Sequence, residues 1–287
     1  MYFKMIIWLA SYPKSGNTFV RAFLSSYYYS KDGNFDFSLL ENIKQFPNEE
    51  FFDQKFNNID EASQHWVKAQ KKIIENKKIK FFKTHSCMAT YKERPFTTAE
   101  TTLGAIYIVR DPRNILTSMK NHFSMNEEEA MEMIKDKQRG LISDEGIFST
   151  YTLISSWANH YNSWAKTNYF RRLIIKYEDL ISDSYETFRD IIVFTNTLIN
   201  RTDGVNKNKL LNAIKSIDFE TLKNKEIKDG LDKSVTSFKK WRRIHKENKN
   251  LFFNLGAQNN WKKLLNKNLS SKIEEEFREE MSDLGYL

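Results

Sequence analysis

The sequence predicts an α/β fold, a single domain over residues 1–287 with a central parallel sheet flanked by helices. Short apolar runs alternate with segments in which apolar residues recur every three or four positions, the pattern of strands joined by crossover helices. A glycine-containing loop joins the first apolar run to a helical segment. At 287 residues the chain suits one such domain better than two small ones.

Four short apolar runs are predicted as strands, because each ends in polar or turn-forming residues. They are residues 5–10, 79–83, 105–109 and 173–177. The predicted helices are residues 19–29, 113–122, 148–167 and 185–197. Parallel sheets bind ligands at the carboxyl ends of their strands, so we expect the polar residues after each strand to converge there.

The remaining segments are predicted to cover this body. Residues 270–284 place Ile273, Phe277 and Met281 on one helical face, which indicates an amphipathic helix packed on the domain. Residues 126–146 and 231–257 are rich in charged side chains, and we expect them to form mobile covers.

The loop after the first strand carries the strongest functional signal. It reads Ser11-Tyr12-Pro13-Lys14-Ser15-Gly16-Asn17-Thr18-Phe19. Backbone N–H groups at the start of the following helix, the helix dipole and the Lys14 ammonium would all attract an anion such as a nucleotide phosphate. The lysine precedes the glycine and no earlier glycine is present, so this P-loop-like segment lacks the Walker pattern of ordinary ATPases. The alternative is a structural corner with a solvated lysine.

The order P-K-S-G-x-T after a strand resembles the 5'-phosphosulfate loop of the PAPS-dependent sulfotransferases of the cytosolic type. That family transfers a sulfuryl group from 3'-phosphoadenosine-5'-phosphosulfate (PAPS) to an alcohol, phenol or amine and releases PAP. The resemblance implies that the donor is bound by Lys14, Ser15, Gly16, Asn17, Thr18 and Phe19. Asn17 and Phe19 stand where Thr and Trp are common, which alters the phosphate contacts and the stacking on adenine.

The second strand ends in Lys83-Thr84-His85, which resembles the K-T-H segment of the same family. The resemblance makes His85 the catalytic base. A neutral imidazole can accept a hydroxyl proton near physiological pH. Lys83 is expected to help hold the sulfuryl oxygens. The alternative for His85 is a hydrogen-bonded histidine that only ends a strand.

The third strand ends at Arg110, and Ser118 follows eight positions later. In the family, an arginine and a serine with this spacing bind the 3'-phosphate of the donor, and a guanidinium suits phosphate oxygens geometrically. Pro112 favours a helix start just after the arginine. The alternative for Arg110 is an ion pair with Asp111 or another carboxylate.

Other resemblances concern the second half of the chain. Tyr177, in a segment like the family's Y-E-D-L, is expected near the adenosine, although packing within a strand is equally compatible. Many members carry an R-K-G triplet before a G-x-W segment, and here Gly256 and Trp261 persist while Asn254 and Leu255 replace the two cations. Gly256 is assigned to the donor site. Candidates to compensate for the lost cations are Arg113, Arg242, Arg243 and Lys262. A helix with Trp157, His160 and Trp164 is interpreted as scaffold.

The sequence therefore predicts a sulfotransferase that moves a sulfuryl group from PAPS to an acceptor hydroxyl without a metal. The acceptor is a glycan, phenol, alcohol or lipid. Its pocket is expected to be lined by segments 30–70 and 126–146, with aromatic residues Phe35, Phe37, Phe51, Phe52 and Trp66. The alternatives are a nucleotide-dependent kinase using Asp111 or Asp179 for magnesium, a PAP-binding family member of reduced activity, and a basic nucleic-acid-binding protein.

Composition limits the setting in which the protein works. The net charge of +8 suits an acidic ligand without identifying one. Cys87 is the only cysteine, so no intrachain disulfide forms and a reducing compartment is consistent. No segment has the length of a membrane span or the pattern of a signal peptide. A cytoplasmic protein is expected, with peripheral membrane contact left open and no nucleic-acid partner.

Overall fold

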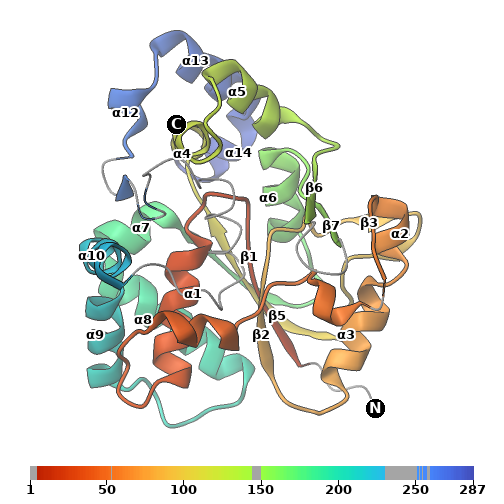
Figure 1. Ribbon diagram of the computed structural model, residues 1–287, viewed down its shortest axis with the longest axis vertical. Coiled ribbons are helices and arrows are strands. Elements are labelled where there is room, and N and C mark those ends of the chain that lie inside the picture. The colour runs from red at the N-terminus through yellow and green to blue at the C-terminus, as the bar shows by residue number, and fades with distance from the viewer. Residues whose placement is uncertain are drawn as a thin grey trace. The chain divides into compact units, whose positions relative to one another are not determined.

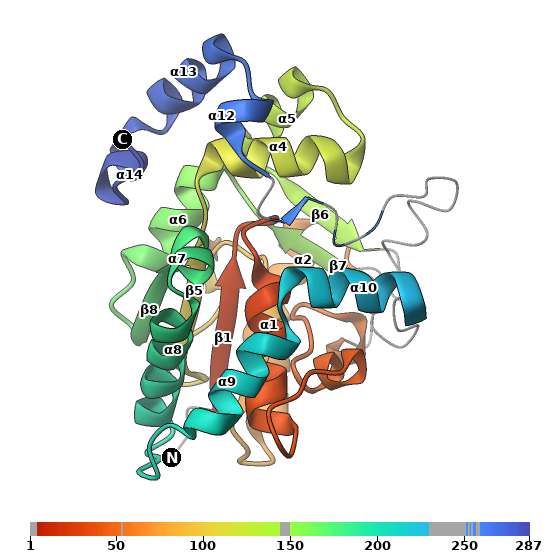
Figure 2. The same ribbon diagram turned by 90° about the vertical axis from the view of Figure 1, so that its left-hand side faces the viewer.

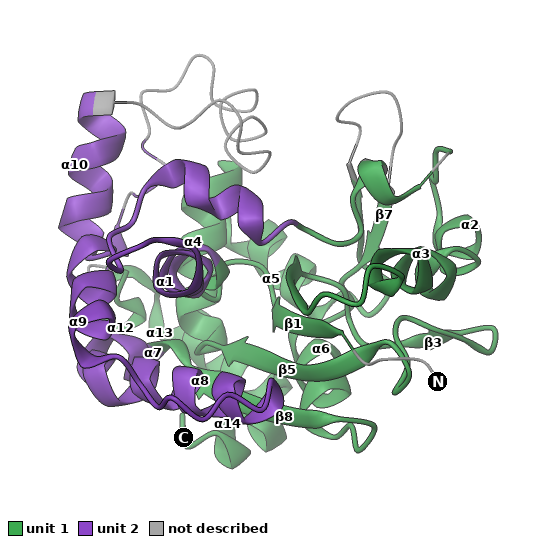
Figure 3. Ribbon diagram, turned by 90° about the horizontal axis from the view of Figure 1, so that it is seen from below, with its two compact units in different colours: residues 1–17, 45–177, 259–287 green, residues 18–44, 178–258 purple. Residues whose placement is uncertain are grey.

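The structure of the protein is a computed structural model that describes residues 5–52, 54–143, 150–229, 251, 253, 255–256 and 259–287. The chain divides into two compact units, which Figure 3 shows in different colours. Unit 1 comprises residues 1–17, 45–177 and 259–287, and unit 2 comprises residues 18–44 and 178–258. Each unit is described separately below.

Unit 1 is built on a four-stranded parallel sheet with the strand order β2-β1-β5-β8. Figure 1 labels β1, β2 and β5 of this sheet. The strands are β1 (Ile6–Ser11), β2 (Lys80–Thr84), β5 (Thr102–Val109) and β8 (Arg171–Lys176). Each predicted strand is present within a few residues of its expected ends. The predicted α/β fold class with a central parallel sheet and flanking helices is confirmed.

Both faces of the central strands are buried, as in parallel sheets generally. Trp8 of β1 contacts Phe46, Phe82 and Phe96, with ring centroids 5.3 to 6.1 Å apart. Ile7 and Leu9, which alternate with Trp8 along the strand, are fully buried too. The apolar run that marks β1 in the sequence therefore reflects burial on two sides.

Helices and two short hairpins complete unit 1. The hairpins pair β3 (Thr90–Tyr91) with β4 (Arg94–Pro95), and β6 (Gly140–Ser143) with β7 (Thr150–Leu153). The helices are α2 (Ile59–Ser63), α3 (Trp66–Ile74), α4 (Pro112–Phe123), α5 (Glu127–Lys135), α6 (Trp157–Ala165), α12 (Trp261–Leu264), α13 (Lys267–Glu276) and α14 (Arg278–Asp283), with a short 3-10 helix, η2 (Glu49–Phe51). Helix α3 joins the core through Trp66, whose ring lies 5.5 Å from that of Phe96.

Unit 2 is helical in its described part (Figure 2). Helix α1 (Asn17–Tyr29) begins where the first segment of unit 1 ends, at residue 17. Helix α7 (Tyr177–Ser182) begins where the second segment of unit 1 ends, at residue 177. They are followed by η1 (Phe37–Asn42), α8 (Ser184–Leu198), α9 (Lys207–Ser216) and α10 (Phe219–Asp229). Phe23 of α1 stacks on Phe188 of α8 at 4.1 Å, which joins these two helices. The prediction of a single domain over residues 1–287 stays a prediction.

Three predicted segments differ from the structure. The helix predicted over residues 148–167 is wrong in its first part, where β-favouring residues form β7, and α6 begins only after the N-cap Ser156. The described part of 126–146 contains a helix that the sequence analysis did not predict, α5, which begins with a capping box from Asn126 and Glu129 and buries its apolar side. Residues 270–284 form two helices that meet at Phe277.

Most of the segment 231–257 lies outside the described residues. Within the described residues, no helix combines the length and apolar character needed to cross a membrane.

Candidate active site

The end of β2 delivers His85 to the loop that follows β1. The His85 Nδ1 atom lies 2.8 Å from the backbone oxygen of Ser11 and 3.3 Å from its Oγ. A carbonyl oxygen only accepts, so Nδ1 carries the proton and donates it to Ser11. The lone pair of the neutral ring is then on Nε2, the nitrogen that faces away from this contact. The tautomer is that of a base acting through Nε2.

The end of β5 delivers Arg110 to the same loop. Its Nη1 donates to the backbone oxygen of Lys14 at 2.9 Å, and its guanidinium lies 4.2 Å from the centre of the Tyr177 ring. Arg110 is 6% exposed, and its Nε has no hydrogen-bond partner among the described residues. The alternative of an ion pair with Asp111 is wrong, because the Asp111 carboxylate binds Arg113 at 2.7 Å.

The loop between β1 and α1 has a conformation that only particular residues tolerate. Lys14 has φ 70° and Gly16 has φ 95°, both in the left-handed region. A Cβ atom on Gly16 would stand 2.4 Å from the Tyr177 ring, so the ring packs directly on the loop backbone. The Asn17 side chain donates to Leu9 O and to Ser11 Oγ, each at 3.1 Å, which ties the helix start back to β1.

The electrostatics of the loop favour an anionic ligand. Burial and the nearby Arg110 lower the pKa of Lys14 from 10.5 to about 7. Ser15 is fully buried, and its Oγ has no hydrogen-bond partner within the described part of the chain. Two cations held close together with an unsatisfied hydroxyl and the start of α1 are the elements of a phosphate site. The residues present therefore fit the phosphate groups of a donor nucleotide.

His85 is held in its neutral form. Burial, followed by the charge of Lys83, lowers its pKa well below the usual value of 6.5, and the contact with Ser11 opposes this only in part. An imidazole without a proton on Nε2 can accept one from a hydroxyl group. As a residue, His85 is partly exposed, whereas residues 81–84 before it are buried.

The other predicted site residues have different surroundings. Lys83 is buried, with Nζ 3.4 Å from Gln45 Oε1. Ser118 lies partly exposed on α4, and no contact of the described residues joins it to Arg110. In unit 2, Phe19 packs edge-on against Phe188 at 5.4 Å, while Thr18 is partly exposed. Gly256 has φ 50° and lies against the Phe219 ring, where a Cβ atom would stand 2.6 Å away. Their assignment to the donor site stays a prediction.

Two of the four side chains proposed to replace the missing cations lie within the described residues. Arg113 is a wrong candidate, because its guanidinium is occupied by Asp111, Glu274 and the backbone oxygen of Tyr286 and lies 3.9 Å from the Trp261 ring. Lys262 is exposed beside the same ring. Arg242, Arg243 and Asn254 lie outside the described residues.

The aromatic residues expected to line the acceptor pocket belong instead to the interior. Trp66 is fully buried in the core of unit 1 and Phe52 is 6% exposed, while Phe35 and Phe37 are buried within unit 2. Phe51 packs on Phe46 at 5.8 Å. The expectation that they contact the acceptor is wrong for the four buried side chains.

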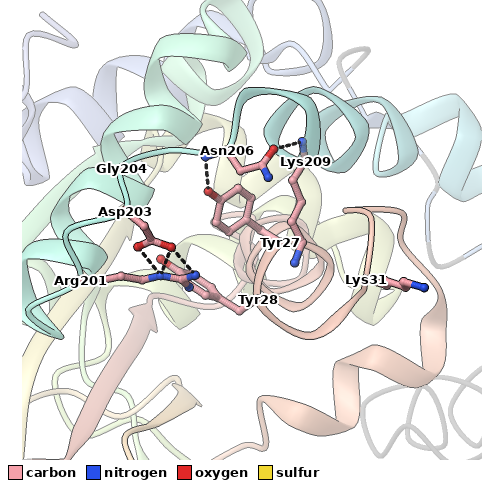
Figure 4. Close-up of a pocket in the computed structure, with 8 residues that line it drawn as sticks. All are labelled: Tyr27, Tyr28, Lys31, Arg201, Asp203, Gly204, Asn206 and Lys209. Carbon is pink, nitrogen blue, oxygen red and sulfur yellow. Dashed lines mark hydrogen bonds and ion pairs between the residues drawn. The ribbon is translucent and has the colours of Figure 1, made fainter.

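A pocket in unit 2 lies at the carboxyl end of α1 (Figure 4). Its volume is about 420 Å³. Arg201 is paired with Asp203 at 2.6 Å, and the Tyr27 hydroxyl accepts from the backbone N–H of Asn206 at 3.0 Å. Arg201 and Asp203 therefore pair with each other, while the Tyr28 hydroxyl donates to Asn196 outside the pocket lining.

Sequence reasoning missed two residues that contact the backbone of the His85 segment. His160 and Trp164, interpreted as scaffold, donate hydrogen bonds to the backbone oxygens of His85 and Ser86. Their positions four residues apart place them on one face of a helix, but this spacing also describes an ordinary aromatic core. No sequence signal distinguishes the two situations.

Comparisons with known proteins identify the family and the fold. Among solved structures, retinol dehydratase in a complex with retinol and PAP is 14% identical with a TM-score of 0.52, over 97% of this chain and 81% of that chain. The sulfotransferase domain from the curacin biosynthetic pathway is 15% identical, over 86% of this chain and 98% of that chain, but its TM-score is only 0.37. No curated protein gives a significant match. The family model described as the sulfotransferase domain matches residues 5–285, and the chain therefore belongs to that family.

Proposed function

We propose that the protein transfers a sulfuryl group from PAPS to an acceptor hydroxyl, with His85 as the base. PAPS supplies the sulfuryl group and leaves as PAP. The observation that carries the proposal is that His85 and Arg110, from two different strands, both bind the backbone of residues 11–14. A base, an ammonium and a guanidinium are thus brought to one loop.

Each of these groups has a separate part in the proposed reaction. His85 Nε2 accepts the proton of the acceptor hydroxyl as the new bond forms. The Lys14 ammonium and the backbone N–H groups of residues 15–18 stabilise negative charge on the 5'-phosphate side. Arg110, with Ser118, recognises the 3'-phosphate, and Lys83 holds sulfuryl oxygens. Tyr177, against the loop, contacts the adenosine.

A nucleotide-dependent kinase would need Asp111 and Asp179 as magnesium ligands, and the contacts of Asp111 argue against that role. Asp111 caps α4 by accepting from the N–H of Arg113 and also binds the Arg113 side chain with both oxygens. A carboxylate used in this way has little capacity left for magnesium. Asp179 alone does not make the magnesium site that a phosphoryl transfer needs.

The base is tested by sulfate transfer from radiolabelled PAPS to a panel of glycans, phenols, alcohols and lipids. His85→Asn keeps an N–H that can reach Ser11 but has no basic nitrogen, so we expect the rate to fall by about 10²- to 10⁴-fold. Lys68→Ala, at an exposed position of α3, is the control and should transfer at the wild-type rate. A His85→Asn variant with wild-type activity would exclude His85 as the base.

The donor site is tested independently of the acceptor by calorimetry with PAP and 5'-AMP. Arg110→Ala removes a charged contact to the 3'-phosphate, so PAP affinity should fall about 10- to 100-fold while 5'-AMP affinity changes little. Arg278→Ala, an exposed arginine on α14, controls for the loss of charge. Equal affinity of the wild type for PAP and 5'-AMP would contradict the role of Arg110.

A further inference from the structure

Two side chains of helix α6 donate hydrogen bonds to the backbone of the segment that carries His85. The Nε2 atom of His160 lies 3.1 Å from the backbone oxygen of His85, and the Nε1 atom of Trp164 lies 3.0 Å from that of Ser86. The two donors are one helical turn apart and serve two consecutive carbonyl groups. His160 and Trp164 are fully buried, so water cannot replace these bonds.

The tautomer of His160 follows from its partners. The His85 oxygen can only accept, so His160 Nε2 carries the proton and Nδ1 must accept. The donor to Nδ1 is the hydroxyl of Tyr107 on β5, at 2.9 Å. Burial lowers the pKa of His160 to about 3, which keeps the ring neutral and this arrangement intact.

These contacts form one chain of hydrogen bonds across unit 1. Tyr107 donates to His160, His160 donates to the His85 backbone, and the His85 ring donates to Ser11 beside the phosphate loop. Each step has a fixed direction, because each link contains a group that can only accept. The chain thus sets both the position of the base and the nitrogen that carries its proton.

We propose that His160, oriented by Tyr107, is a positioning residue that holds the His85 segment so that the His85 ring keeps its Nδ1–H bond to Ser11. This inference rests on the proposed role of His85 as the base. A purely apolar ring at position 160 would remove the side-chain donor to the His85 carbonyl. The segment would then shift, and the ring would lose its fixed tautomer.

The first test compares two substitutions at position 160. His160→Phe keeps the ring but removes the donor, and we expect kcat to fall about 10-fold with the Kd for PAP unchanged. His160→Gln has an amide N–H that can reach the His85 oxygen and should recover most of the rate. Trp157→Phe, on the same helix, is the control, since the Trp157 indole N–H has no partner among the described residues.

The second test reads the tautomers directly, by NMR of protein carrying ¹⁵N in its five histidines. Wild-type His85 should be protonated on Nδ1 and His160 on Nε2. In His160→Phe, His85 should show a mixture of the two tautomers. Tyr107→Phe removes one hydroxyl from a fully buried ring. In this variant His160 should show a mixture of both tautomers, and His85 should show a smaller fraction of its second tautomer than in His160→Phe.

The outcomes separate this inference from the proposed function. A single unchanged His85 tautomer in His160→Phe would overturn the inference, and so would a wild-type rate in that variant. If His160→Phe does not fold, Tyr107→Phe decides in the same way. A wild-type protein that transfers no sulfuryl group would contradict the proposed function, while the NMR result would still show whether His160 positions His85.

Discussion

At the scale of single residues, Lys14 combines two unfavourable features that a ligand can offset. Its backbone lies in the left-handed region at φ 70°, which costs about 1–3 kcal/mol for a residue other than glycine. Its ammonium is close to Arg110 and poorly solvated, so its pKa falls to about 7. Backbone strain and perturbed pKa values of this kind cluster at binding sites, where the surrounding structure holds them in place.

This lowered pKa predicts proton uptake when PAP binds. Unliganded Lys14 loses its proton as the pH rises through about 7, and an adjacent phosphate restores the charge. Uptake should therefore be near zero at pH 6 and approach one proton at pH 8.5, measured by calorimetry in buffers of different ionisation enthalpy. Lys14→Met should abolish the difference. Uptake near zero at both pH values in the wild type would show that Lys14 is charged throughout.

Gly16 is predicted to be intolerant of any side chain. Gly16→Ala places a Cβ atom 2.4 Å from the Tyr177 ring at φ 95°, so the ring or the loop must move. Gly285→Ala is the matched control, because Gly285 has φ 68° and no atom within 4 Å of its Cβ position. We expect PAP affinity to fall at least 10-fold for Gly16→Ala only, by calorimetry. Equal affinity of the two variants would show that Tyr177 yields without cost.

The sequence predicted residues of the site that share an edge of the sheet. Lys14, His85 and Arg110 each follow a strand, and parallel pairing brings strand ends together. His160 could not be found in this way, because its importance comes from a hydrogen bond to a backbone atom of a distant strand. Gly256 was assigned to the donor site from a family motif and lies against Phe219 in the described structure, and its contact with the donor stays a prediction.

At the scale of elements, several polar contacts hold the start of α4 in unit 1. Asp111 caps the helix and binds the buried Arg113, which in turn contacts Trp261. Asn259 accepts from Thr117 and donates to the Asn114 backbone, at 2.8 Å each. The chain that follows the undescribed residues is therefore attached to the helix that begins beside Arg110.

Asp111→Asn should destabilise the protein strongly. It leaves the buried Arg113 charge without one of its two carboxylate partners, and breaking a buried ion pair typically costs about 3–5 kcal/mol in the free energy of unfolding. Glu186→Gln breaks an exposed pair with Arg189 and should cost less than about 1 kcal/mol. Urea denaturation of both variants measures the difference. A small effect of Asp111→Asn would mean that Glu274 alone keeps Arg113 satisfied.

The ends of a helix or strand were predictable where the spacing of apolar residues stayed the same along the whole element. The strands β1 and β2 agree with the prediction within one residue at each end. Residues 150–153 were misassigned because their apolar spacing continues into α6, and pairing with the distant β6 decides their structure. The segment 126–146 looked like a cover because its charged face dominates the composition, although Ala130, Met131 and Ile134 are buried.

At the scale of the whole molecule, buried histidines predict sensitivity to acid. His160 has a pKa of about 3 when folded and an ordinary pKa of 6.5, so only the unfolded chain binds its proton between these values. Stability should therefore fall by about 1.4 kcal/mol per pH unit below 6.5 from this residue. His160→Gln should flatten the pH dependence of the unfolding free energy between pH 6.5 and 4. An unchanged slope would show that other groups dominate it.

The order of the strands shows what sequence and structure contribute at this scale. The alternation of strands and helices predicts a parallel sheet, but the order β2-β1-β5-β8 comes only from the pairing. That order places the ends of β1 and β5 side by side, which explains why Arg110 reaches the loop after β1. The family model over residues 5–285 extends the assignment to parts where the motifs are weak.

Cys87 gives a chemical means of observing the segment that holds His85. It stands two residues after the histidine, its N–H donates to Leu153 O at 2.7 Å, and burial raises the pKa of its thiol. A thiol in this state reacts with alkylating reagents only when the segment opens. Because the chain has a single cysteine, the alkylation rate of the intact protein counts those openings without any engineered label.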